Sequence, residues 1–151
     1  MVFLADGGNA VCRLDLEVGW GDVDAAGIVY YVKYFDWFSD GRVALLKQVN
    51  MPYSSYFHGQ GINMAAVEAY CRYRRALKLE EGFTLHTRLA KLERARMTFE
   101  YKITRHEDGE VAVEGRTVHA YVDDTGKPFD VKKRFPRLWE ELCEKFGIGV
   151  N

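Results

Sequence analysis

The strongest constraint in this sequence is a change of hydrophobic period between residues 14 and 49. From Leu14 to Trp20, apolar and polar residues alternate, which is typical of a half-buried β-strand. After Tyr31, apolar residues recur every three or four positions, which is the stripe of an amphipathic α-helix. The sequence therefore predicts a strand at about residues 11–20, a tight turn, and one long helix at about residues 31–49.

The turn between these two elements carries the residues of greatest chemical interest. Gly27 suits a backbone that turns sharply or lets a ligand come close. Asp24 lies just ahead of the first helical turn, whose backbone N–H groups have no acceptor within the helix. Hydrolysis of a thioester needs a carboxylate to attack the carbonyl carbon or activate water, and donors to stabilise the oxygen that becomes negative. The competing interpretation is that Asp24 only caps the turn, as Asp often does.

The rest of the chain predicts four more strands and a second helix. Alternating patterns place strands at residues 65–74, 83–92 and 96–105, and a last strand at 111–122 with a bulge at Gly115, where the alternation changes phase. Pro136 begins a helix at about residues 136–146. The long helix and the sheet are each apolar on one side, so they bury these sides against each other. The expected class is α+β: a curled antiparallel five-stranded sheet around one long central helix, with an extra C-terminal helix.

Length and composition limit the other possibilities. We expect a single domain over residues 1–151 with its core at about 11–128, and the 21 basic and 22 acidic residues give no reason to expect a nucleic-acid partner. No apolar run is long enough to span a bilayer, and the first residues lack the basic region of a signal peptide. Three cysteines without a CxxC pair favour a reducing, cytoplasmic setting. The four histidines are not spaced as metal ligands, so we expect no metal and no cofactor other than the coenzyme A of a substrate.

The segment G-D-V-D-A-A-G-I-V-Y-Y, followed by an aromatic helix, resembles the acyl-CoA thioesterases of the 4-hydroxybenzoyl-CoA thioesterase and YbgC type. The match runs from about Val18 to Arg42, and the later strand order fits more loosely to about Pro128. The resemblance implies the hotdog fold and self-association into homodimers or homotetramers, with the active site between subunits. It also implies that Asp24 is the catalytic carboxylate, as nucleophile or as general base, and that Asp22 is structural.

The remaining site residues also follow from this resemblance. The backbone N–H of Tyr31 would polarise the thioester carbonyl, and Gly27 would shape the turn that aims it. Ser39, with Asp40 beside it, stands where the 4-hydroxybenzoyl-specific members have a carboxylate that receives the substrate phenol, so the chain departs from them at this position. Tyr30 and Tyr34 either line an aromatic pocket or belong to the core. By the same resemblance, the basic residues expected to contact the phosphates of coenzyme A are Arg94, Arg96, Lys91 and Arg88.

The function expected from the sequence is hydrolysis of a coenzyme A thioester to a free acid and the thiol. One alternative is a protein of the same fold that binds acyl-CoA without hydrolysing it, and another is a thioesterase that acts on an acyl carrier protein. A hotdog hydratase is disfavoured because no histidine lies at the start of the long helix. The sequence does not choose the acyl group.

Overall fold

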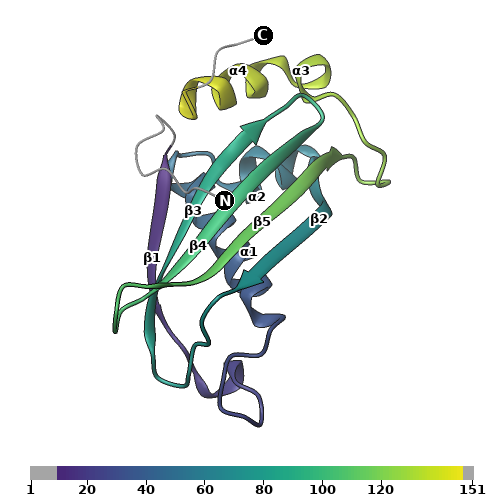
Figure 1. Ribbon diagram of the computed structural model, residues 1–151. Coiled ribbons are helices and arrows are strands. Elements are labelled where there is room, and N and C mark those ends of the chain that lie inside the picture. Colours follow the sequence, from purple (N-terminus) through teal and green to yellow (C-terminus); the bar gives the residue numbers. More distant parts are fainter. Residues whose placement is uncertain (1–9, 148–151) are drawn as a thin grey trace.

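A computed structural model describes residues 10–147; residues 1–9, which include the stretch inspected for a signal peptide, and residues 148–151 lie outside it. Five antiparallel strands form one sheet in the order β1-β3-β4-β5-β2, so β1 and β2 are its edges (Figure 1). The strands are β1 (Val11–Glu17), β2 (Asn63–Tyr73), β3 (Gly82–Leu92), β4 (Arg96–Arg105) and β5 (Val111–Val122).

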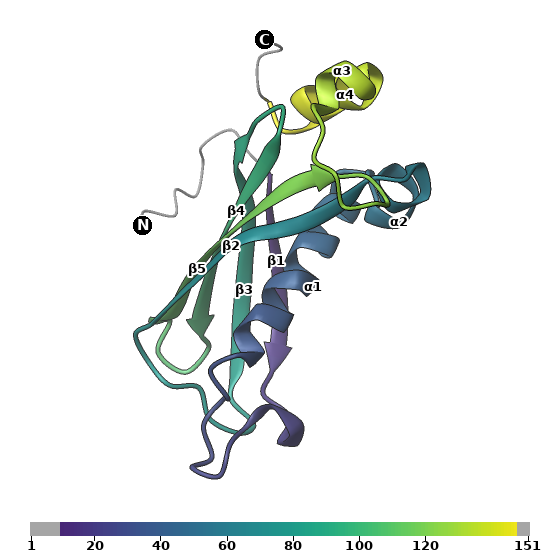
Figure 2. The same cartoon turned by 90° about the vertical axis from the view of Figure 1, so that its right-hand side faces the viewer.

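The long helix α1 (Lys33–Gln48) lies against one face of this sheet, and the strands bend around it (Figure 2). The helix α4 (Pro136–Lys145) lies at one end of the sheet, as Figure 1 shows. The short elements are η1 (Trp20–Asp22), α2 (Tyr53–Tyr56), η2 (His58–Gln60) and α3 (Val131–Arg134). The predicted α+β class, with its curled sheet, central helix and C-terminal helix, is confirmed. Within residues 10–147, no helix is both long enough and apolar enough to cross a membrane.

The core forms where α1 meets the middle of the sheet, at an unusually close approach. The Phe38 ring on α1 stacks on Tyr101 of β4 with 4.2 Å between ring centroids. A side-chain carbon added at Gly115 of β5 would overlap the Phe38 ring, and one added at Gly41 of α1 would overlap Thr87 of β3. Both glycines therefore let the helix lie closer to the sheet than larger residues would.

The predicted bulge at Gly115 is wrong. Gly115 pairs in regular register with Cys71 on one side and Tyr101 on the other. In the pairing with β4, the shift on β5 falls at Ala112 instead, because Ile103 pairs with Val113 while Thr104 pairs with Val111. The hydropathy pattern changed phase because inward-facing positions of β5 hold glycine and polar residues, and the backbone register does not change there.

The ends of the first two elements also differ from the prediction. Strand β1 stops at Glu17, and Trp20, expected to face the core, lies in η1 with 81% of its surface exposed. Helix α1 begins at Lys33, so Tyr31 precedes it and is 62% exposed. The segment between strand and helix is thus longer than the periodicity indicated, and it contains the turn with Asp24.

The close approach of α1 predicts the cost of a single methyl group. We expect Gly115→Ala to lower the free energy of unfolding by about 1–3 kcal/mol, because the new carbon overfills the space of the Phe38 ring. Gly21→Ala is the matched control: nothing lies within 4 Å of the added carbon, and the change should stay within about 0.5 kcal/mol. Urea unfolding measures both, and a Gly115→Ala variant as stable as wild type would contradict this account.

Candidate active site

A small hairpin joins β1 to α1 and holds Asp24 at its tip. Val23 and Val29 form an isolated antiparallel bridge, and the Asp24 N–H donates to the Ile28 carbonyl at 2.8 Å. The Gly27 N–H donates back to the Asp24 carbonyl at 3.0 Å, and Gly27 has a φ of 78°. Only glycine adopts this left-handed conformation at little cost, so Gly27 shapes the turn as expected.

The two carboxylates of G-D-V-D have different surroundings. Asp22 accepts the Gly19 N–H at 2.8 Å and forms an ion pair with Lys33 at 3.3 Å, which fits the structural role expected for it. Asp24 is exposed, and its Oδ1 accepts only the nearby Ala26 N–H, at 2.8 Å. Within residues 10–147, no cationic side chain pairs with Asp24. Its carboxylate therefore keeps most of its hydrogen-bonding capacity for another molecule.

The backbone at the start of α1 leaves a donor available. No acceptor in the described part of the chain takes the N–H of Tyr31. The Tyr31 carbonyl accepts the hydroxyl of Tyr73 from β2 at 2.6 Å, which fixes this residue against the sheet. An unpaired N–H at the positive end of a helix attracts an oxygen that carries negative charge. The hairpin and the helix start thus combine a free carboxylate with a free donor.

The expected substrate residues separate into two groups. Tyr30 is exposed beside Tyr31, with 5.0 Å between the ring centroids. Tyr34 belongs to the core, where its ring packs against Trp37 and Tyr73, and burial raises the pKa of its phenol to about 12. Asp40 lies exposed on α1 and lines none of the cavities described below, whereas Ser39 faces a cavity.

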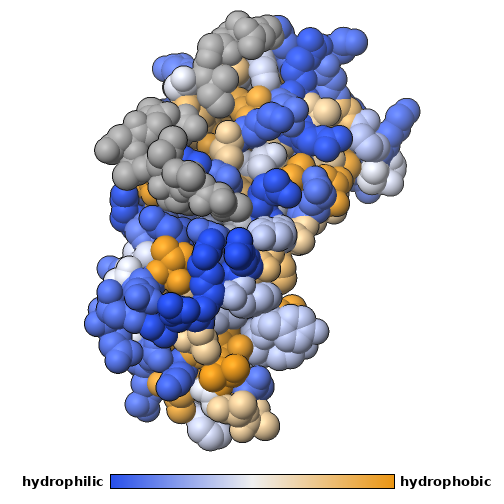
Figure 3. All heavy atoms as spheres, viewed as in Figure 1, coloured by the Kyte–Doolittle hydropathy of each residue, from blue (hydrophilic) through white to orange (hydrophobic). Residues whose placement is uncertain are grey.

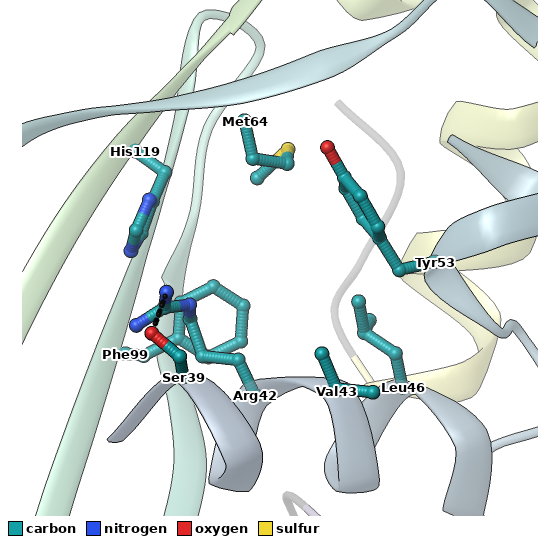
Figure 4. A pocket seen from close by; sticks show the side chains of 8 residues that line it. All are labelled: Ser39, Arg42, Val43, Leu46, Tyr53, Met64, Phe99 and His119. Atoms are coloured by element: carbon teal, nitrogen blue, oxygen red, sulfur yellow. Dashed lines mark hydrogen bonds between the residues drawn. The ribbon is translucent and has the colours of Figure 1, made fainter. Parts of the chain in front are cut away.

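That cavity has a volume of about 220 Å³ and lies between α1 and the sheet (Figure 4). Its walls come from α1, α2, β2, β4 and β5. The lining residues are Ser39, Arg42, Val43, Leu46, Tyr53, Met64, Phe99 and His119. Of these, only Ser39 was expected from the sequence, although Arg42 follows it by three residues and so lies on the same helix face. This spacing is the sequence signal from which Arg42 could have been predicted as a neighbour of Ser39.

A chain of hydrogen bonds runs along one wall of the cavity. Arg42 donates to Ser39 Oγ at 2.9 Å and to the Tyr101 hydroxyl at 3.0 Å. The Tyr101 hydroxyl lies 2.6 Å from Thr117 Oγ1, which in turn lies 2.9 Å from His119 Nε2. Burial, and to a lesser extent the charge of Arg42, lowers the pKa of His119 to about 4. His119 is therefore neutral at pH 7.

The basic residues expected at coenzyme A lie near the connection between β3 and β4. Arg94 pairs with Asp130 at 2.6 Å, and Arg88 pairs with Glu100 at 2.5 Å. Lys91 lies 3.8 Å from Glu93, while Arg96 is exposed and has no partner among the described residues. The sheet face opposite α1, which includes the Arg88–Glu100 pair, is largely hydrophilic where it is visible in Figure 3. Arg96 is thus the most available of the four.

In a single chain these parts do not meet. The hairpin with Asp24 and the connection between β3 and β4 lie at opposite ends of the sheet (Figure 1). Asp24 also lines none of the four clearest cavities within residues 10–147. Asp24 and Gly27 thus share the turn of the hairpin and Tyr31 follows it on the same segment, whereas the expected acyl and coenzyme A residues lie elsewhere in the chain.

Comparison with known proteins identifies the family. Residues 18–146 match the family model of the thioesterase-like superfamily. The chain is 29% identical to YneP of Bacillus subtilis (strain 168) over 89% of this chain and 96% of YneP. It is 25% identical to acyl-CoA thioesterase YbgC of Haemophilus influenzae over 82% and 93% of the two chains. The crystal structure of DHNA-CoA thioesterase from Staphylococcus aureus has the same fold, with a TM-score of 0.82, 24% identity and 89% of each chain covered. The chain thus belongs to the thioesterase-like superfamily.

Proposed function

We propose that the protein is an acyl-CoA thioesterase whose reaction takes place at the hairpin before α1. The observation that carries the proposal is that one short segment contains both an accessible carboxylate, that of Asp24, and a backbone N–H without an acceptor among the described residues, that of Tyr31. The family and the name of YbgC support an acyl-CoA substrate for this chain.

In the proposed reaction, water and the thioester become a carboxylic acid and a thiol. The Asp24 carboxylate either attacks the carbonyl carbon, giving a mixed anhydride that water then opens, or accepts a proton from the attacking water. The bond between carbon and sulfur breaks, and the sulfur leaves as coenzyme A, which takes up a proton. The Tyr31 N–H donates to the carbonyl oxygen as it becomes negative, and one such donor typically contributes about 10²–10³ in rate.

The proposed site is shared between two copies of the chain. Ser39 lies roughly 9 Å along α1 from its first residue, Lys33, and the ten residues of β4 separate the two ends of the sheet by roughly 30 Å. A second copy related by a two-fold axis would run in the opposite direction and bring its Asp24 hairpin toward the cavity and Arg96 of the first. Light scattering tests this association, and a particle with the 17.4 kDa mass of one chain under assay conditions would contradict it.

The edge strand β2 is the proposed contact between the copies. Its outer backbone groups have no neighbouring strand within residues 10–147, and Val67, Tyr70 and Tyr73 are each about half exposed along it. An exposed edge with apolar side chains favours pairing with another strand.

The three cysteines at positions 12, 71 and 143 are all unpaired, which supports the proposed cytoplasmic location.

The proposed role of Asp24 is tested by removing its charge. We expect Asp24→Asn to reduce thiol release from the best acyl-CoA substrate by at least about 100-fold, because an amide neither attacks the carbonyl nor accepts the proton. Asp36→Asn is the matched control: Asp36 is also exposed near the start of α1 and lies 3.8 Å from Lys33. It should stay within about twofold of wild type. Equal rates for Asp24→Asn and wild type, or tight acyl-CoA binding without any thiol release, would refute the proposal.

The proposed contact of Arg96 with coenzyme A predicts an effect on binding alone. Arg96→Gln should raise KM for an acyl-CoA roughly two- to fivefold and leave kcat nearly unchanged, since an exposed ion pair is worth little. The same acyl group on pantetheine, which lacks the nucleotide phosphates, should show no change in KM. Steady-state kinetics on the two substrates measures this, and an equal rise for both would mean that Arg96 does not contact the nucleotide.

A further inference from the structure

The cavity beside α1 combines an apolar body with one cationic end. Val43, Leu46, Met64 and Phe99 supply most of its wall. In Figure 4 the guanidinium of Arg42 lies at the end formed by Ser39, Phe99 and His119, and Tyr53 stands at the other end. A dry cavity of about 150 Å³ holds benzene, so about 220 Å³ accommodates a substituted ring or a short chain.

Arg42 has a charge that nothing in the described chain neutralises. Its two hydrogen bonds go to neutral hydroxyl groups, those of Ser39 and Tyr101. No carboxylate within residues 10–147 forms an ion pair with it. Arginine carries five N–H donors and cannot accept, so donors remain for a further group. A partly buried cation without a counter-charge is costly, and an anion bound in the cavity would offset that cost.

The hydrogen bonds along the wall occupy the hydroxyl groups at this end and leave the guanidinium of Arg42 as its donor to a ligand. Because Arg42 only donates, Tyr101 accepts from it, and either hydroxyl group can donate in the next bond, between Tyr101 and Thr117. Thr117 Oγ1 also shares a hydrogen bond with Nε2 of His119. The Ser39 hydroxyl donates its proton to the Phe35 carbonyl, at 3.1 Å. No carboxylate stands at this end to receive a phenol, so the site favours a group that only accepts.

We propose that this cavity binds the far end of an acyl group that carries a carboxylate, and that Arg42 is the residue that selects it. The assignment rests on the proposed thioesterase function and names its substrate class: coenzyme A monothioesters of dicarboxylic acids, either aromatic or short-chain. The guanidinium pairs with the free carboxylate, and the apolar walls contact the carbons between that carboxylate and the thioester. The thioester itself is presented by the Asp24 hairpin of the second copy.

Thiol release from matched substrates tests the preference. The pairs are 4-carboxybenzoyl-CoA against 4-methylbenzoyl-CoA, and adipoyl-CoA and suberoyl-CoA against hexanoyl-CoA and octanoyl-CoA. We expect kcat/KM to favour the carboxylate member of at least one pair by roughly 10- to 100-fold, the value of a hydrogen-bonded charge. Arg42→Gln, which keeps N–H donors but not the charge, should lower kcat/KM for the carboxylate substrates more than for their neutral partners and so abolish this preference. Arg137→Gln, on the surface of α4, should change neither.

Binding without turnover separates this inference from the function it rests on. In the Asp24→Asn background, calorimetry should show the carboxylate member of at least one of these pairs binding at least tenfold more tightly than its neutral member, and Arg42→Gln should remove the difference. Circular dichroism and thermal unfolding confirm that each variant is folded, and Arg42→Met, which also removes the charge, replaces Arg42→Gln if the latter is not. Equal affinities in the Asp24→Asn background would overturn the assignment of Arg42 even if hydrolysis is observed. A clear difference in affinity without hydrolysis by wild type would uphold the binding site and overturn the proposed function.

Discussion

The contact of Phe38 with the sheet is the constraint on which the rest of the structure depends. Gly115 and Gly41 remove the two side-chain carbons that would hold α1 away from β5 and β3. The helix therefore lies deep in the curve of the sheet, with Phe38 stacked on Tyr101. This close approach limits the space left along the side of α1, where the cavity lies.

The hairpin before α1 separates two carboxylates that are only two residues apart. Asp22 forms an ion pair with Lys33 and accepts a hydrogen bond from the Gly19 N–H, and these two interactions hold the hairpin in place. Asp24 follows at the tip, where its carboxylate accepts one backbone N–H, that of Ala26 at 2.8 Å. No cationic side chain within residues 10–147 pairs with it. The Tyr73 hydroxyl donates to the Tyr31 carbonyl, while the Tyr31 N–H has no acceptor among the residues that the structure describes. One carboxylate thus stabilises the turn and the other is available for chemistry.

The sequence predicted most of the fold because its two periods are strong. The helix and all five strands were predicted, since apolar residues recur at the helical or strand period along each of them. The ends were less well predicted: Trp20 continues the alternation but lies in η1, and Tyr31 continues the helical stripe but precedes the first residue of α1 by two positions. Hydropathy describes the composition of a face, and it does not say where backbone hydrogen bonds stop.

The site was only partly predictable for a related reason. Asp24, Gly27 and Tyr31 lie within one short motif, so the sequence alone indicates them as candidates. Arg42, by contrast, resembles any charged residue on the solvent face of a helix until the sheet is placed against α1. Arg88 and Arg94 looked equally suited to phosphate, and only tertiary structure shows that Glu100 and Asp130 already pair with them.

The central claim is that the acyl carbonyl sits against the start of α1. A ¹H–¹⁵N correlation spectrum tests it most directly, with an acyl-CoA analogue in which a methylene group separates the sulfur from the carbonyl so that no thioester can be cleaved. The account predicts that the amide of Tyr31 moves downfield on binding, as expected for a new hydrogen bond to the carbonyl oxygen, together with the amides around Asp24. Saturating binding that leaves the signals of residues 24–31 unmoved would contradict it.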